Sequence, residues 1–172
     1  MAIIKSPIFK DITESEISEM TAAGFLRARK FRKNSFIYHV TDSVHEIGIV
    51  ASGQVIQLNI QICGGNKAIM SNITSGHVFA ETYALTGEPL MVDAVASETS
   101  VILFLDMDKL MNSQFENTHC KDTILNNLLH ISIQKNLTLS NRIFCTSPKT
   151  IRERLLIYLS NESRKGLAVR NS

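Results

Sequence analysis

Residues 25–105 form a long series of short apolar runs separated by turn signals, and this pattern limits the folds open to the chain. The runs are rich in Val, Ile and Phe, which favour strands, and the separators include turns such as Ser52-Gly53 and Ser75-Gly76. The predicted strands are 25–31, 35–39, 46–50, 54–62, 67–73, 91–96 and 101–105. Many short strands at near-regular spacing predict an antiparallel sandwich, roll or barrel.

Helical patterns flank the strand region on both sides. Thr13 and Glu16 have the spacing of a capping box, which predicts a short helix that ends near Gly24. A second short helix is predicted at 106–111. From about 118 to 144 the sequence has neither Gly nor Pro, so we predict one continuous helix about 40 Å long.

The long predicted helix has two apolar stripes. They consist of Ile124, Leu128 and Ile131, and of Leu129, Ile133, Leu137 and Phe144. One stripe packs a helix onto its own domain, and a second implies another surface to cover. Two interpretations stay open. In the first, the two stripes form one broad apolar face that packs on the parent domain. In the second, the helix pairs with its copy in a parallel dimer. The dimer interface that we predict consists of Ile124, Leu128, Ile131, Leu137 and Thr138.

A further helix is predicted after Ser147-Pro148, with Ser147 as N-cap and Pro148 at the first helical position. It runs over about 149–163, and the nine residues that follow are too few for the two helices of a helix-turn-helix. We therefore expect three parts, namely a strand-rich domain at 1–117, a dimerisation helix at 118–146 and a C-terminal part at 147–172.

The net charge of +2 hides an uneven distribution. Residues 149–172 hold six basic and two acidic residues, so the rest of the chain is net negative and is not expected to bind nucleic acid. Cys63, Cys120 and Cys145 lack a C-x-x-C spacing, which argues against disulfides and metal clusters. Without a signal peptide or an apolar run of about 18 residues, a cytoplasmic location is expected.

Two motifs resemble segments of the Crp/Fnr family of bacterial transcription regulators. The first is Ser75-Gly-His-Val-Phe-Ala-Glu81, which looks like the family's Gly-x-x-Phe-Gly-Glu. The second is Lys149-Thr-Ile-Arg-Glu-Arg-Leu-Leu-Ile-Tyr-Leu159, which looks like the first helix of its DNA-binding domain. The resemblance implies an α+β chain with an antiparallel double-stranded β-roll, or jelly-roll, of the cyclic-nucleotide-binding type. It also implies an N-terminal helix, a long dimerisation helix, a hinge at Ser147 and Pro148, and a truncated DNA-binding domain, so that operator DNA is a partner of the full-length form only.

The resemblance also allows a test for a nucleotide site. In cyclic-nucleotide-binding members, a Glu accepts a hydrogen bond from the ribose hydroxyl, and an Arg-Ser pair neutralises the phosphate. Here Glu81 matches, Ala80 replaces Gly, and the Arg-Ser positions fall on Met91 and Val92. Because an unpaired buried charge is costly, we predict that the chain does not bind cyclic AMP or GMP. The pocket either takes an unknown, less anionic small-molecule effector or is filled by its own side chains. Its predicted residues are Met70, Gly76, Val78, Phe79, Ala80, Glu81, Thr82, Met91 and Val92.

Two alternatives belong to other classes of protein. A ligand-free dimeric interaction module is one, because the chain is too short for a complete DNA-binding domain. A metal-dependent cupin-type enzyme is the other, although its candidate ligands lack an H-x-H spacing. Those ligands would be His39, His45, Glu46, His77 and Glu81. The sequence has no Ser-His-Asp motif, P-loop or G-x-G-x-x-G, so we expect no enzyme activity and no catalytic residues. We also expect a homodimer that has no cofactor, no metal and no membrane contact.

Overall fold

A computed structural model describes residues 6–60, 67–112 and 118–146, together with Thr150, Arg152, Leu155, Leu156 and Leu159. The chain divides into two compact units, Met1–Asn127 and Leu128–Ser172. The strands are β1 (Leu26–Phe31), β2 (Phe36–Tyr38), β3 (Glu46–Ser52), β4 (Gln54–Ile60), β5 (Lys67–Thr74), β6 (Val78–Phe79), β7 (Asp93–Ala96) and β8 (Ser100–Asp106). The helical elements are η2 (Pro7–Phe9), α1 (Glu14–Ala22), α2 (Glu81–Thr86), α3 (Met107–Asn112) and α4 (Thr118–Thr146).

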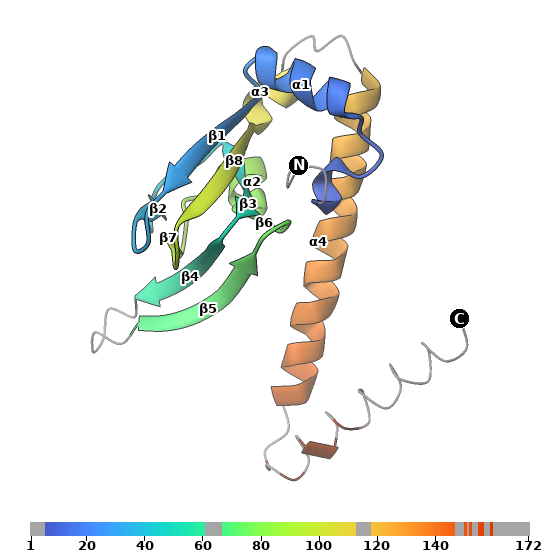
Figure 1. Ribbon diagram of the computed structural model, residues 1–172. Helices are drawn as coiled ribbons and strands as arrows, with labels where there is room; N and C mark the ends of the chain where they lie inside the picture. The colour runs from blue at the N-terminus through green and yellow to red at the C-terminus, as the bar shows by residue number, and fades with distance from the viewer. Residues whose placement is uncertain are drawn as a thin grey trace. The chain divides into compact units, whose positions relative to one another are not determined.

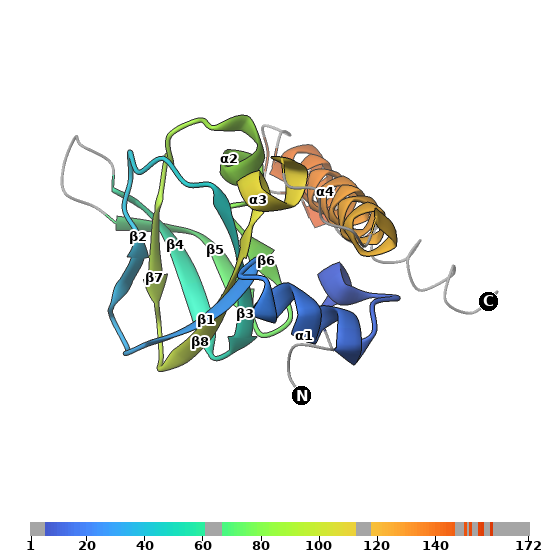
Figure 2. The same cartoon turned by 90° about the horizontal axis from the view of Figure 1, so that it is seen from above.

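The strands form two four-stranded sheets, ordered β1-β8-β3-β6 and β2-β7-β4-β5. Every pairing within them is antiparallel, with Leu26 opposite Leu105 in the first sheet and Val55 opposite Ile73 in the second. Figure 1 and Figure 2 show the two sheets facing each other, with the chain passing between them from β1 to β2 and from β7 to β8. The β-roll with an N-terminal helix and a long C-terminal helix is therefore confirmed.

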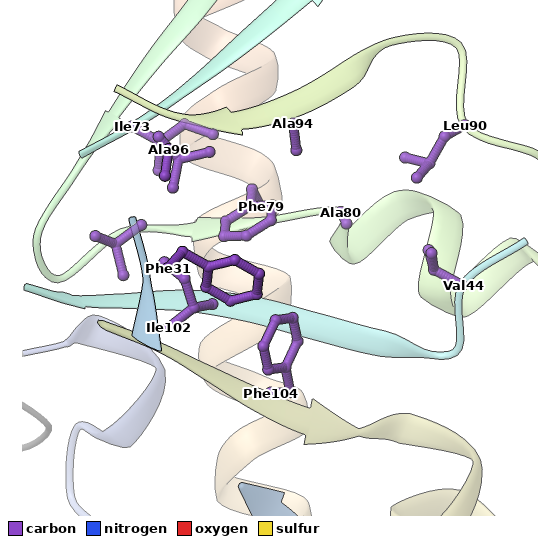
Figure 3. Packing of buried hydrophobic residues seen from close by; sticks show 12 residues of the cluster. Phe31, Val44, Ile73, Phe79, Ala80, Leu90, Ala94, Ala96, Ile102 and Phe104 are labelled. Atoms are coloured by element: carbon purple, nitrogen blue, oxygen red, sulfur yellow. The ribbon is translucent and has the colours of Figure 1, made fainter. Parts of the chain in front are cut away.

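An apolar core fills the space between the two sheets, as Figure 3 shows. Its aromatic rings meet edge to face, with centroids 6.1 Å apart for Phe31 and Phe104 and 5.9 Å apart for Tyr38 and Phe104. Burial of one such side chain stabilises a fold by about 1.5–3 kcal/mol. The buried residues of this core are Phe31, Val44, Val50, Val55, Ile73, Phe79, Ala80, Leu90, Ala94, Ala96, Ile102 and Phe104.

A second apolar layer lies on the other face of the sheet that contains β8. Because side chains alternate along a strand, Leu103 and Leu105 face away from the core that holds Ile102 and Phe104. They are buried, as are Met20 of α1 and Ile124 of α4. Helices therefore cover this face, and side chains from different helices meet there: the Cys120 Sγ of α4 lies 3.4 Å from the Met20 Sδ of α1. Burial raises the pKa of the Cys120 thiol to about 11.

The N-terminal elements are fixed by capping and by one buried amide. Thr13 and Glu16 form the predicted capping box, with the Glu16 side chain 2.8 Å from the Thr13 amide nitrogen. The Asn127 side chain of α4 donates to the carbonyl oxygens of Ile8 and Lys10, at 3.0 and 2.7 Å. The segment between η2 and α1 is therefore hydrogen-bonded to the first half of α4.

The structure differs from the sequence-based element boundaries in three places. The strand expected from Met91 begins at Asp93, because Met91 and Val92 lie in bends. Strand β6 was not expected, since a strand of two residues shows no alternation. Residues 118–127 of α4 belong to the same unit as the roll, whereas the sequence suggested a boundary at 117.

Candidate functional site

The segment between β5 and α2 is anchored on the end of β3. Gly76 has a φ of +89°, which favours glycine, and its amide donates to the Val50 carbonyl oxygen at 2.8 Å. The Val50 amide in turn donates to the His77 carbonyl oxygen at 3.0 Å. The Ser6 hydroxyl, which is buried, donates to the Gly76 carbonyl oxygen at 2.6 Å. This turn therefore has a fixed position relative to both β3 and the N-terminal segment.

Of the predicted pocket residues on β6 and just after it, Phe79 and Ala80 belong to the core of the roll, whereas Val78 precedes Phe79 on the strand and points to the opposite face. Val78, Phe79 and Ala80 are all buried, and Figure 3 shows Phe79 between the two sheets. The Phe79 ring lies 6.1 Å from that of Tyr38 and directly over the backbone of Gly48. An ideal Cβ on Gly48 would lie 2.2 Å from the Phe79 Cζ. Phe79 thus occupies interior space that a ligand could otherwise fill.

Ala80 has a left-handed backbone conformation, with φ at +62°. This conformation costs an L-residue about 1–2 kcal/mol, which explains why a glycine suits the position in the motif that this segment resembles. Ala80 is the N-cap of α2, and Glu81 follows as its first residue with only 8% of its surface exposed. The helix ends at Gly87, whose φ is +73°. The tight turn into α2 is therefore preserved without glycine.

Three of the predicted pocket residues are not in the interior. Met91 is 74% exposed, and Thr82 on α2 is exposed as well. Met70 is 54% exposed, at the point where the pairing of β4 and β5 shifts by one residue. Such a bulge interrupts the alternation of side chains along the strand, so the alternation in the sequence does not predict which face of the sheet Met70 lies on. Val92 is half-buried. The structure thus buries Val78, Phe79, Ala80 and Glu81 but leaves Met70, Thr82 and Met91 exposed.

An open cleft of about 510 Å³ lies elsewhere, where the loop before β3 meets the junction of β8 and α3. It contains none of the predicted pocket residues. The pairing of β3 with β8 explains the charged lining of this cleft, because it places Glu46 opposite Asp106 at one end of the two strands. The lining residues are Tyr38, Ser43, Val44, His45, Glu46, Asp106, Asp108 and Lys109.

The charged side chains of this cleft have partners within the chain. Arg27 Nε donates to Glu46 Oε1 at 2.9 Å, and this hydrogen bond raises the pKa of the Arg27 guanidinium. Lys109 Nζ lies 3.2 Å from Asp106 Oδ2. The Tyr38 hydroxyl donates to the Glu46 carbonyl oxygen at 3.2 Å, and burial, reinforced by the Glu46 charge, raises the pKa of Tyr38. Tyr38 therefore stays a neutral hydrogen-bond donor.

The histidines of the cupin alternative have separate surroundings. His39 Nδ1 lies 3.9 Å from the buried Asp93, and His45 Nδ1 lies 3.0 Å from Asp108. His77 Nδ1 lies 3.2 Å from the Thr74 hydroxyl. In the described part of the chain, no group of three or more His, Cys, Asp or Glu side chains is placed to hold a metal ion.

The two stripes of α4 have different environments. Ile124 and Leu128 are 0% and 3% exposed, so these two members of the predicted dimer interface are buried within a single chain. Of the other members of the predicted interface, Ile131 is half-buried, and Leu137 and Thr138 are exposed. The dimer interface itself stays a prediction. The other stripe is exposed, in the part of α4 that belongs to the second unit. It consists of Leu129, Ile133, Leu137 and Phe144.

The remaining predictions concern the C-terminal part. The hinge residues Ser147 and Pro148 lie outside the described residues, as does most of 149–172. Leu155, Leu156 and Leu159 are described and are exposed. Among the described residues, no helix is both long enough and apolar enough to cross a membrane.

Two antiparallel sheets rolled around an apolar core, with a short helix after β6 and a long helix after β8, define the class of cyclic-nucleotide-binding-type β-rolls. The chain belongs to the cyclic nucleotide-binding domain family, whose model matches residues 28–116. A search of curated proteins gave no significant match.

Solved structures share this fold at low sequence identity. A cyclic nucleotide-binding domain from Methylobacillus flagellatus is similar with a TM-score of 0.74 and 15% identity, over 87% of this chain and 85% of that one. The N-terminal domain of a transcriptional regulator from Streptomyces coelicolor has a TM-score of 0.66 and 13% identity, over 81% and 95%. The catabolite activator protein of Thermus thermophilus has a TM-score of 0.62 and 22% identity, over 81% of this chain and 64% of the activator.

Proposed function

We propose that this chain is the effector-sensing and dimerisation part of a Crp/Fnr-type transcription regulator, in which a helix-turn-helix of the full-length form binds operator DNA. A change at the segment 75–92 would shift α4, and a hinge at Ser147 and Pro148 would pass this shift to the DNA-binding domain. In this role the chain binds an effector and does not catalyse a reaction.

One observation carries the proposal. The roll continues through α3 into a helix of 29 residues whose second half exposes a row of apolar side chains. Exposed apolar stripes of this kind mark surfaces that another chain covers. Two transcription regulators among the similar solved structures support the same role.

We expect the protein not to bind cyclic AMP. From Ala68 to Ser100, which includes β6, α2 and β7, the sequence has no Lys or Arg. A cyclic phosphate in the roll would therefore lack a counter-charge from these elements, and Phe79 and Ala80 already fill interior space. Titration with fluorescently labelled cyclic AMP should show no saturation up to about 1 mM, the concentration that corresponds to about −4 kcal/mol. Saturation in the micromolar range would contradict this prediction.

We expect dimerisation through the exposed stripe of α4. A Leu137→Glu substitution places a charge in the middle of this stripe and should convert a dimer into a monomer in light scattering, because burial of an unpaired carboxylate is unfavourable. Ser132→Glu is the matched control, since Ser132 is also exposed on α4 but lies about 140° round the helix from Leu137 and belongs to neither apolar stripe. A monomeric unmodified protein, or a Leu137→Glu variant that remains dimeric, would show that the stripe is not the interface.

A ligand-free dimeric module is the second candidate function, and the filling of the roll favours it. Phe79, Ala80 and Leu90 belong to the same buried cluster, so the interior next to α2 is packed by the chain itself. Native mass spectrometry of the purified protein distinguishes the two functions. A bound small molecule supports a sensor, and a chain mass without addition after exposure to candidate metabolites supports the module.

A further inference from the structure

The basic residues of the roll are concentrated in one short segment. Residues 25–41 contain five Lys and Arg side chains and neither Asp nor Glu, although residues 1–148 as a whole have a net negative charge. All five lie between positions 27 and 33, on β1 and the turn that follows it. They are Arg27, Arg29, Lys30, Arg32 and Lys33.

The strand that carries these residues is at the edge of its sheet. In the order β1-β8-β3-β6, β1 pairs with β8 on one side, and none of the strands that the structure describes pairs with its other side (Figure 1). Residues 27–30 in the middle of β1 are all exposed. An edge of this kind presents main-chain donors and acceptors that another extended segment can pair with.

Most of the cations on this edge have no counter-charge. Arg27 is paired with Glu46. Within the described part of the chain, Arg29, Lys30, Arg32 and Lys33 make no ion pair, although each is exposed. The Arg29 guanidinium lies 5.3 Å from the centre of the Phe31 ring, and this contact orients its charge.

The cations lie on both faces of the strand. Arg29 shares a face with Phe31, which points into the core, and Lys30 points to the opposite face because successive side chains alternate. A nucleic-acid backbone needs cations on one common surface, whereas an added strand also directs its own side chains to both faces. The alternation therefore favours an extended peptide as the occupant.

We propose that the β1 edge is a docking site for a protein partner with an acidic, extended segment, which adds as a strand beside β1. Main-chain hydrogen bonds would supply affinity, and Asp or Glu side chains opposite Arg29 and Lys30 would supply specificity. Charged side chains, and lysine in particular, are one of the features that keep edge strands from pairing with copies of themselves. Four unpaired cations repel a second copy of β1 and attract an acidic strand, so the occupant is a different chain. This site is separate from the segment 75–92 and does not depend on effector binding.

The probe for this site is a fluorescein-labelled octapeptide with the repeat Glu-Glu-Thr-Thr, whose adjacent Glu side chains point to opposite faces of an extended strand. Its binding is measured by fluorescence anisotropy at low ionic strength. We expect saturable binding that weakens with added salt. An Arg29→Glu and Lys30→Glu double variant should bind about tenfold more weakly, because two opposite-charge cross-strand pairs become like-charge pairs. The control is a Lys10→Glu and Arg152→Glu double variant, which changes the net charge equally at exposed positions outside β1 and should bind like the unmodified protein. Circular dichroism melting establishes that both variants are folded.

Two further probes decide between occupants. A peptide of the same charge in which the threonines are replaced by proline cannot pair as a strand, and we expect it to bind about tenfold more weakly. Equal binding of the two peptides would overturn strand addition. Duplex DNA that binds in place of the peptide would show a nucleic-acid surface. Absence of binding by the Glu-Glu-Thr-Thr peptide, or equal loss in both double variants, would overturn the site itself.

Discussion

Replacement of Gly48 by alanine is expected to lower the free energy of unfolding by about 3 kcal/mol. The new Cβ would lie 2.2 Å from the Phe79 Cζ and 2.4 Å from its Cε1, much closer than carbon atoms approach. Gly48 lies on β3, which is paired with β8 on one side and β6 on the other, so its backbone cannot easily move away. The Phe79 ring is enclosed by the core and contacts the Tyr38 ring. Urea unfolding followed by circular dichroism measures the change.

A second substitution tests whether the clash with Phe79 is the cause. Leucine at position 79 lacks the outer ring atoms that the Gly48→Ala Cβ meets, so Phe79→Leu should relieve part of the strain. The double variant is expected to be about 1–2 kcal/mol more stable than the sum of the single variants predicts. Strictly additive effects would show that the loss arises elsewhere in β3.

The sequence predicted the architecture because the strands of this roll are short apolar runs rich in Val, Ile and Phe that strong turn signals separate. The capping box at Thr13 and the Gly- and Pro-free stretch after 118 also predicted α1 and α4. The bulge at Met70 and the two-residue strand β6 were not predictable, since both depend on pairing with distant strands. Local patterns determine the type of an element better than the contacts that bend or shorten it.

The site was predictable only in part, for the same physical reason. The motif at Ser75–Glu81 located the turn into α2, but its match could not show that Phe79 fills the interior over Gly48. The long helix showed two apolar stripes in the sequence, and periodicity alone does not say which one its own domain buries. Ile124 and Leu128 are buried, and Leu129 and Leu137 are exposed, which only the tertiary packing determines.

Asn127 is a buried polar residue of α4, next in sequence to the buried Leu128. Its amide donates to the carbonyl oxygens of Ile8 and Lys10, and the neighbouring Ser6 hydroxyl donates to the Gly76 carbonyl oxygen at 2.6 Å. The short segment that contains η2 therefore contacts both α4 and the turn before β6. Through these hydrogen bonds a displacement of the turn at Gly76 can move the part of α4 that contains Asn127.

The Asn127→Ala substitution is accordingly expected to destabilise the protein by about 2 kcal/mol, because it leaves two carbonyl oxygens without their donor. Asn126→Ala is the matched control: Asn126 is exposed on the same helix, gains the same helix propensity and should change stability by no more than about 0.5 kcal/mol. A structural role confined to α4 would affect only the helix and η2. If the segment also positions the turn, Asn127→Ala should accelerate hydrogen exchange of the Gly76 amide, which is bonded to the Val50 carbonyl oxygen. Unchanged exchange at Gly76, with faster exchange in α4, would show that the turn is held by β3 alone.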